Sequence, residues 1–327
     1  MAIHQSARAS AIVLGLALLQ VPAALQAAPA TTDLEEVIVT ARKRVESLQD
    51  VPISMSAVSA QTLQDQSAIR FQDSLNSIPN VSWSSDDIAD ASITIRGISS
   101  DTNNFGIEPA VGVYMDEVYI PRPTAVNQTA LDIERVEVLR GPQGTLFGRN
   151  TVAGVISIVT EDPTPSWRSE GDLTVGRYDL LQARASISGP VSERTGIRLS
   201  ASRLTQKGWF RQTTPGFPDF GGEDSWALRA KLRFKPTDSL DLVASIGYVR
   251  DDAVIGNSYI ADGPLAGING AAIDSIGTNV DNFARRRLWM GSLRANWDLP
   301  GHTLTSVTGY SSERYESFKD QDYTPLD

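Results

Sequence analysis

Alternation of apolar and polar residues after Trp167 limits the possible folds of this chain more than any other feature. Successive side chains of a β-strand point to opposite faces, so strict alternation gives one apolar and one polar face. Three segments alternate clearly, and the polar face of the second carries Arg229, Lys231 and Arg233. Strands of about ten residues with such faces are typical of transmembrane β-barrels. The apolar positions are Leu181, Ala183, Ala185 and Ile187, then Trp226, Leu228, Ala230, Leu232 and Phe234, then Leu240, Leu242, Ala244, Ile246 and Tyr248.

The same pattern predicts about seven strands in the second half of the chain. We expect short periplasmic turns at Gly189-Pro190 and Pro236-Thr237, and a longer extracellular connection over residues 250–284. A soluble antiparallel sandwich also alternates, but its strands are usually about 5–6 residues long. A transmembrane barrel is favoured over a soluble sandwich by three features: the strand length, the charged face and an export signal. The expected strands cover residues 169–176, 179–188, 195–205, 224–234, 239–249, 286–298 and 302–314.

Residues 1–28 are predicted to be a secretory signal peptide. Arg8 precedes an apolar run over Ala11–Leu19, and small residues follow at Ala27–Ala30, where cleavage is expected. The run is too short for a transmembrane helix, which needs about 20 residues. A buried N-terminal helix is the alternative. We therefore expect export through the periplasm to the cell outer membrane, with any spanning segment formed by strands.

The composition argues against several classes of function. A formal net charge of −10 does not suit a nucleic-acid partner. The chain has no cysteine and two histidines, His4 and His302, and His4 lies in the predicted signal peptide. We therefore expect no catalytic residue, no metal ligand, no cofactor and no enzymatic activity. The pairs Asp86-Asp87 and Asp251-Asp252 lack EF-hand spacing, and we interpret them as solvated loop charges.

The region between the signal peptide and the alternating segments divides into two parts. Leu34–Ala41 contains four consecutive β-branched residues, Val37 to Thr40, in a polar context. Such a segment suits strand addition to another protein's sheet, although an ordinary first strand fits equally well. Residues 46–165 mix helical and strand patterns with glycine-rich turns. Pro163-Thr-Pro165 then forms a natural boundary, because proline removes backbone donors.

Several segments in this region resemble TonB-dependent outer-membrane receptors, of the siderophore-receptor-like kind. The first looks like the TonB box, and the others match the family's plug domain in order. The resemblance implies a TonB-box segment at 29–45, a plug domain at 46–165 and the N-terminal part of a β-barrel at 166–327. The matching segments are Glu36–Arg44, Val51–Ser54, Ile95–Gly97, Val111–Val118, Ile133–Gly144, Thr145–Asn150 and Gly154–Thr160.

The expected fold class is a mixed α+β plug followed by an incomplete antiparallel transmembrane β-barrel. A plug of about 120 residues has a radius of gyration of about 13–14 Å. Only barrels of roughly 22 strands hold such a domain, so about seven strands are part of a presumed 22. The end at Thr324–Asp327 lacks an apolar-aromatic closing strand, and we interpret the chain as truncated.

The resemblance also implies which residues carry function. Coupling to TonB is expected at Glu35, Glu36, Val37, Ile38, Val39, Thr40 and Ala41. Plug arginines at Arg96 and Arg140 are expected to latch the plug to acidic residues of the barrel wall, and solvated strand-end arginines are the alternative. Turns are expected at Gly97, Gly141, Gly144 and Gly148, where glycine permits positive φ. A phosphate-binding loop is disfavoured, because no Lys-Ser or Lys-Thr follows these glycines.

The expected function is TonB-dependent import of a scarce nutrient, with a ferric siderophore as the first candidate cargo. The expected partners are TonB, outer-membrane lipid and an iron chelate or another small nutrient. Three alternatives remain open: a plug-like sensor that transports nothing, a non-functional receptor fragment, and import of a carbohydrate or vitamin. The loops that would set ligand specificity are mostly absent from this sequence.

Overall fold

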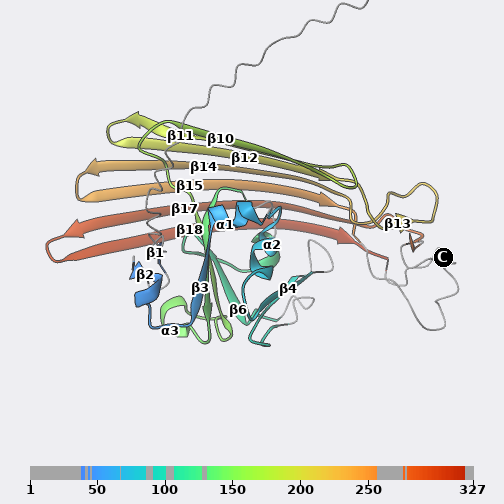
Figure 1. Ribbon diagram of the computed structural model, residues 1–327, viewed down its shortest axis with the longest axis horizontal. Coiled ribbons are helices and arrows are strands. Elements are labelled where there is room, and N and C mark those ends of the chain that lie inside the picture. Colours follow the sequence, from blue (N-terminus) through green and yellow to red (C-terminus); the bar gives the residue numbers. More distant parts are fainter. Residues whose placement is uncertain are drawn as a thin grey trace, which may run out of the picture. The chain divides into compact units, whose positions relative to one another are not determined.

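The seven alternating segments form one antiparallel sheet, as the sequence predicted. Strand order follows the chain, β10-β11-β12-β14-β15-β17-β18, and every neighbouring pair is antiparallel. Figure 1 shows these strands side by side as one curved layer. Their bounds are β10 Arg168–Gly176, β11 Leu180–Ser192, β12 Thr195–Gln206, β14 Glu223–Thr237, β15 Leu240–Ala253, β17 Phe283–Leu299 and β18 His302–Phe318.

The computed structural model describes part of the chain. The described residues are 38–40, 43–44, 46–66, 68–85, 91–100, 107–126, 131–255, 275–276 and 278–320. The predicted signal peptide, Asp86-Asp87 and the end at Thr324–Asp327 lie outside them. Over the described part of the chain, no helix is both long enough and apolar enough to cross a membrane.

The predicted turns at two prolines were wrong in detail. Gly189-Pro190 lies inside β11, and the chain turns instead between Ser192 and Thr195. Pro236-Thr237 ends β14, and the turn comes just after it. The register shifts near both prolines, so irregular pairing accommodates each proline within its strand. Gly189 is required there, because a Cβ would lie 2.4 Å from Trp167 Cδ2.

The two faces of the sheet differ as the alternation predicted. Leu181 and Ile187 on β11 are each 45% exposed, whereas Gln182 and Ser188, which directly follow them, are buried. Large apolar side chains continue along the exposed face, and tryptophans lie toward both ends of β17 at positions 289 and 297. Their separation of 297 − 289 = 8 residues is about 27 Å along a strand. A strand tilt of about 35–45° reduces this to about 19–22 Å along the membrane normal, which fits within the ~25 Å apolar band of outer-membrane barrels.

The plug contains a five-stranded sheet and short helices, in agreement with the expected α+β class. Its strand order is β3-β8-β9-β6-β7, with β6 and β9 parallel. These strands are β3 Met55–Ser59, β6 Val111–Met115, β7 Val118–Ile120, β8 Ile133–Arg140 and β9 Gly154–Thr160. The helices are α1 Ala60–Asp65, α2 Phe71–Asn76 and α3 Gly144–Phe147, with the 3-10 turns Leu48–Asp50 and Pro123–Val126.

Short paired segments complete the described elements. β4 (Val81–Ser85) and β5 (Ala91–Ile95) form a hairpin in the plug. β1 (Ile38–Val39) pairs with β2 (Glu46–Ser47), and β13 (Arg211–Gln212) pairs with β16 (Ser275–Ile276).

One hydrophobic core joins the plug to the inner face of the long sheet. Phe71, Leu75 and Ile95 are buried in the plug part of this core. The same cluster includes Ala227, Val249 and Leu288 from the long sheet. Apolar burial is the main favourable term in packing, so the plug is held against the sheet by a shared core as well as by charges.

Candidate functional site

The described part of the predicted coupling segment is held against the plug. Val39 is fully buried, whereas Ile38 beside it is 41% exposed. The backbone N–H of Thr40 donates a hydrogen bond of 2.9 Å to Glu137 Oε1, and the Thr40 hydroxyl donates to the same oxygen at 3.2 Å. Glu35, Glu36, Val37 and Ala41, also predicted to couple to TonB, lie outside the described residues.

Glu137 is the centre of this attachment. Its side chain is fully buried, and Arg135 Nε donates to Oε1 at 2.8 Å. Arg135 also donates to the Thr40 hydroxyl at 3.2 Å and pairs with Glu134. Hydrogen bonds to a buried carboxylate are stronger than neutral ones. We call Thr40, Arg135 and Glu137 the coupling latch.

The sequence analysis did not single out Arg135 and Glu137. Both lie in the plug segment Ile133–Gly144, where alternation of apolar and charged residues is imperfect. Val136 and Val138 are buried in the main core, and Leu139 is buried in a second cluster with Tyr114 and Val155. β8 is therefore covered on both faces, which leaves Glu137 buried. The sequence signal for Glu137 was its position as an acidic residue between the apolar residues Val136 and Val138 of an expected strand.

Arg96 and Arg140 bind groups of the plug itself. Arg96 donates to Ser54 Oγ at 3.0 Å, and Arg140 donates to Ser56 Oγ at 2.7 Å and to the Pro79 carbonyl at 3.2 Å. Burial, and then the nearby Arg96 charge, lower the pKa of Arg140. Their predicted pairing with barrel carboxylates stays a prediction.

The four predicted turn glycines lie at the ends of plug elements. Gly97, Gly141 and Gly148 have positive φ values of 80°, 95° and 81°. Gly97 and Gly141 follow β5 and β8, and Gly148 follows α3. Gly144 begins α3 within the connection from β8 to β9.

Ion pairs join the plug to the long sheet, mostly with the acid on the plug. Arg198 on β12 contacts Asp132 at 2.5 Å, and both side chains are buried. Lys231 on β14 lies 3.1 Å from Asp162 and 3.4 Å from Asp116. Among the described residues the opposite polarity occurs once, where Arg70 before α2 pairs with Glu223 of β14. Buried pairs of this kind fix position more than they add stability.

Asp162 is the most connected of the plug acids at this boundary. Besides Lys231, it accepts a hydrogen bond of 2.7 Å from Arg294 on β17. Burial alone would raise the pKa of Asp162, but the charges of Lys231 and Arg294 outweigh burial and lower it. The neighbouring Glu161 behaves oppositely, because burial raises its pKa more than Arg198 lowers it.

The interpretation of Asp251-Asp252 as solvated loop charges was wrong. β15 continues through Ala253, and Asp251 points inward, where Arg286 Nε and a terminal nitrogen donate to it at 2.9 and 2.7 Å. Both side chains are almost fully buried. The strand extends past the apolar pattern because Asp251 and Asp252 lie in register with Arg286 and Arg285.

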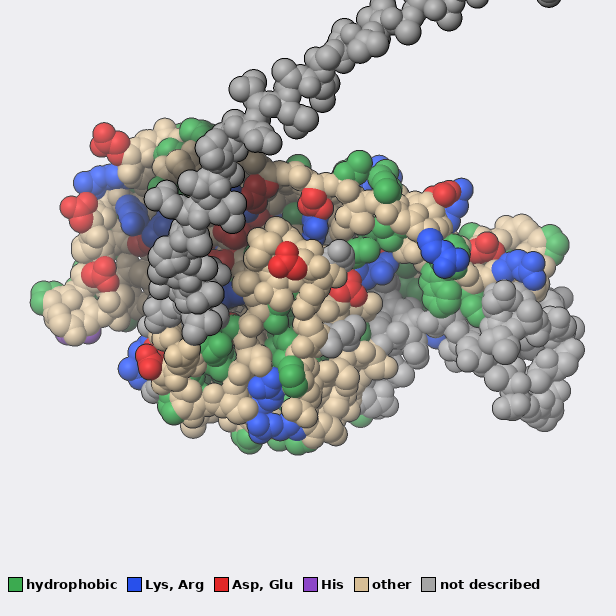
Figure 2. All heavy atoms as spheres, in the orientation of Figure 1, with side chains coloured by type: hydrophobic (Ala, Val, Ile, Leu, Met, Phe, Trp, Pro, Cys, Tyr) green, Lys and Arg blue, Asp and Glu red, His purple; other side chains and the backbone are tan. Residues whose placement is uncertain are grey.

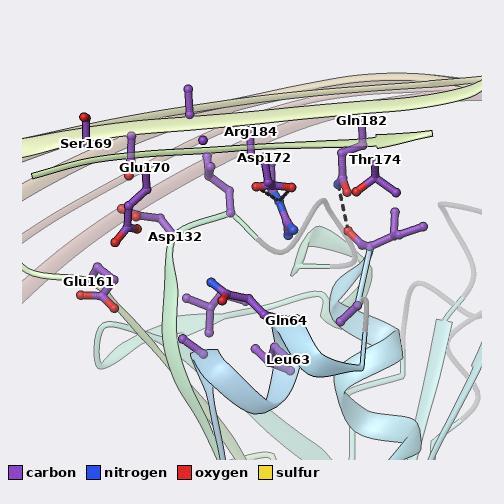
Figure 3. A pocket seen from close by; sticks show the side chains of 18 of the residues that line it. Leu63, Gln64, Asp132, Glu161, Ser169, Glu170, Asp172, Thr174, Gln182 and Arg184 are labelled. Carbon is purple, nitrogen blue, oxygen red and sulfur yellow. Dashed lines mark hydrogen bonds and ion pairs between the residues drawn. The ribbon is translucent and has the colours of Figure 1, made fainter. Parts of the chain in front are cut away.

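A cavity of about 750 Å³ lies between α1 and strands β10 and β11. In Figure 3, Arg184 and Asp172 point into it from the strands, and Glu161 lies near its edge. Gln182 crosses the gap to donate to the Ile69 carbonyl at 3.2 Å. Figure 2 shows acidic and basic side chains in the hollow between plug and sheet. The cavity is thus polar and suits a hydrated solute better than an apolar one.

Comparison with known proteins decides the family. The TonB-dependent receptor plug domain model matches residues 47–155. The chain therefore contains a plug domain of the TonB-dependent receptor family. The pesticin receptor of Yersinia pestis is 30% identical over 231 residues, covering 69% of this chain and 33% of that protein. The iron-regulated outer membrane virulence protein of Vibrio cholerae is 26% identical over 301 residues, covering 84% of this chain and 42% of that protein.

Solved structures show the same fold. The ferric yersiniabactin uptake receptor FyuA from Yersinia pestis superposes with a TM-score of 0.70 at 24% identity, covering 81% of this chain and 41% of that chain. The chain spans about a third of the pesticin receptor's length. Its long sheet is therefore part of the wall of an outer-membrane β-barrel, with the apolar face toward lipid.

Proposed function

We propose that this chain supplies the coupling strand, the plug and part of the wall of a receptor that imports a scarce nutrient by force from TonB. The coupling latch is the observation that carries the proposal. In the described part of this β-prone segment, Ile38 is exposed and Thr40 is attached to the plug by a small number of hydrogen bonds. Such an attachment holds at rest and breaks under a directed pull.

The mechanism follows from the position of the latch. TonB would add a strand of its own to residues 35–41, using main-chain hydrogen bonds that are independent of side-chain identity. Tension on this strand acts first on Thr40, and Thr40 is bonded directly to Glu137 of the plug strand β8. Force is therefore delivered to the plug sheet, and a local unit of low stability opens before the whole domain unfolds.

A ferric siderophore is the proposed cargo. The related proteins include ones named pesticin receptor, ferripyoverdine receptor and iron-regulated outer membrane virulence protein. Iron held by its own chelator needs no protein ligands, which agrees with a sequence of two histidines and no cysteine. The alternative is a non-iron nutrient, because the vitamin B12 transporter BtuB of Vibrio vulnificus is 26% identical over 259 residues.

Replacing Ile38 with proline tests the coupling step. Proline removes the backbone donor at this position and disfavours strand addition, whereas Ile38→Val keeps a β-branched residue. Cells carrying each variant would be given iron-55 on a catecholate, a hydroxamate and a phenolate chelator, and cobalt-57 cyanocobalamin. We expect Ile38→Pro to abolish uptake of the transported compound while surface binding persists, and Ile38→Val to transport normally.

Two outcomes of the same assay would contradict the proposal. Normal uptake by Ile38→Pro would remove the coupling role of residues 35–41. Uptake of cyanocobalamin without uptake of any iron chelate would be consistent with the coupling role, but it would show that the cargo is not a ferric siderophore.

A further inference from the structure

Lys43 follows the coupling strand and is held by the plug through its side chain. Its backbone N–H donates to the Thr40 carbonyl at 2.9 Å, which closes a tight turn after β1. Its φ of 60° lies in the left-handed region, which residues other than glycine seldom adopt. Such a conformation persists where surrounding contacts fix it. The side-chain contacts of Lys43 therefore fix the path of the chain after the coupling strand.

Two aromatic rings and one carboxylate surround the ammonium group of Lys43. Its Nζ lies 4.8 Å from the ring centroid of Phe147 in α3 and 5.8 Å from that of Tyr114 in β6. The same nitrogen donates to Glu117 Oε2 at 3.3 Å. An ammonium group within about 6 Å of a ring centroid is attracted by the negative face of the ring. We call Tyr114, Glu117 and Phe147 the lysine cage.

The lysine cage is built by contacts of the plug itself. The rings of Tyr114 and Phe147 meet edge to face with their centroids 5.0 Å apart, and the Tyr114 hydroxyl donates to the Phe147 carbonyl. Tyr114 also packs against Tyr119 of β7, with ring centroids 5.5 Å apart. None of these contacts involves Lys43, so the cage is a preformed site into which the lysine side chain docks.

Glu117 belongs to a two-residue turn whose other residue faces the barrel wall. Asp116 and Glu117 connect β6 to β7, and both have positive φ, 46° and 68°, as in a type I′ hairpin turn. Asp116 accepts hydrogen bonds from the backbone N–H of Thr160 at 2.9 Å and from its hydroxyl at 2.6 Å. It also lies 3.4 Å from Nζ of Lys231 on β14. One turn thus contacts the coupling segment through Glu117 and the wall through Asp116.

The lysine cage and the coupling latch hold the same segment at different places. The coupling latch holds Thr40 on β8, whereas the cage holds Lys43 on α3 and on the hairpin of β6 and β7. The side chains of Lys43 and Glu117 are 35% and 30% exposed, so their ion pair is weak and reversible. A small movement of the turn is therefore enough to break it.

We propose that Lys43 is a second hold on the coupling segment, and that the turn Asp116-Glu117 makes this hold depend on docking of the plug against the wall. Its role in transport rests on the proposed coupling function of residues 35–41. While Asp116 contacts Lys231, the turn presents Glu117 to Lys43 and the cage is occupied. When the turn leaves Lys231, Glu117 moves with it and the segment is released. Two neighbouring residues thus couple the wall to the segment.

Labelling of a buried position tests the second hold in the resting protein. Val39→Cys in the detergent-solubilised protein reacts with maleimide when the segment is released, because Val39 is fully buried at rest. Lys43→Met keeps a long side chain but removes its charge. In the Val39→Cys background it should raise the labelling rate about fivefold, which corresponds to about 1 kcal/mol. Lys43→Arg, which keeps the charge, and Arg44→Met, which removes the neighbouring exposed charge, should label like the parent.

A pair of wall variants tests the dependence on docking. Lys231 and Arg294 both contact Asp162, and of these two cations Lys231 is the one that also contacts Asp116. Lys231→Met should therefore raise the labelling rate, whereas Arg294→Met should leave it unchanged. Lys231→Met should add nothing in the Lys43→Met background, because both changes act through one contact. Asp116→Asn provides the same comparison if Lys231→Met folds poorly.

Three results would each overturn the proposal. The first is labelling of Lys43→Met at the parent rate, and the second is equal acceleration by Lys43→Met and Arg44→Met. The third is an effect of Lys231→Met that persists in full when Lys43 is already replaced. Labelling is measured without TonB and without cargo, so it is independent of the uptake assay. Normal uptake by Ile38→Pro would remove the coupling role and leave the hold at Lys43 standing.

Discussion

At the scale of single residues, the most consequential group is the buried carboxylate of Glu137. One oxygen of Glu137 accepts bonds from Thr40 and Arg135, and the other oxygen has no protein partner. The sequence indicated that residues 35–41 form a coupling strand. It could not indicate what holds that strand, because Thr40 and Glu137 are 97 residues apart. A contact of this kind depends on tertiary structure alone.

Glu137→Gln should loosen the coupling latch. A neutral amide keeps the shape but replaces charge-assisted bonds with weaker ones, a loss of about 1–2 kcal/mol. That loss raises the population of released strand by a factor of roughly 5–30. The chain has no cysteine, so a single Val39→Cys reports release through its rate of maleimide labelling, because Val39 is fully buried at rest.

Glu134→Gln is the matched control for this measurement. Glu134 also pairs with Arg135, but its side chain is 41% exposed and it does not contact Thr40. Labelling that is equally fast in Glu134→Gln and Glu137→Gln, or unchanged by either, would mean that Glu137 does not hold the strand.

At the scale of elements, alternation located all seven long strands but not their ends. β17 and β18 each extend to 17 residues, beyond the apolar pattern. The added residues include Arg285 and Glu316, which lie in register with each other, so a hydrophobic pattern alone could not mark the ends. The ion pairs between plug and sheet could not be predicted from the sequence either. The sequence predicted latch arginines on the plug, whereas the sheet supplies most of the described cations.

The contact between β7 and β18 depends on Gly309. A Cβ at this position would lie 2.3 Å from Val118 Cγ1 of the plug. Gly309→Ala should therefore push the plug strand away and destabilise the protein by roughly 1–3 kcal/mol, as overpacking does. Gly247→Ala is the control on the same inner face, since its Cβ would meet atoms no nearer than 3.7 Å.

Thermal unfolding in detergent would measure both glycine variants. The midpoint should fall for Gly309→Ala and stay within experimental error of the wild type for Gly247→Ala. A lower midpoint for both variants would show that strand glycines matter for backbone reasons and not because the plug docks on β18.

At the scale of the whole molecule, one sheet serves two environments. Its inner face completes the plug core with Ala227, Val249 and Leu288 and holds the plug with basic side chains. Its outer face is apolar between two sets of aromatic residues. The sequence predicted this division because alternation fixes the two faces directly. It left the cavity between α1 and the first strands unpredicted, because that space depends on how two domains meet.

The most direct test of this account is a nitroxide scan along β17 in lipid bilayers. Single cysteines would replace residues 288–298 one at a time, and collision rates with oxygen and with a polar nickel complex would be measured. We predict a period of two, with high oxygen accessibility at the odd-numbered positions, which include Trp289, Leu293 and Trp297, and low accessibility at the even-numbered positions. Oxygen accessibility that does not alternate, or is low on both faces, would contradict the account, because the outer face would then be buried in protein instead of lipid.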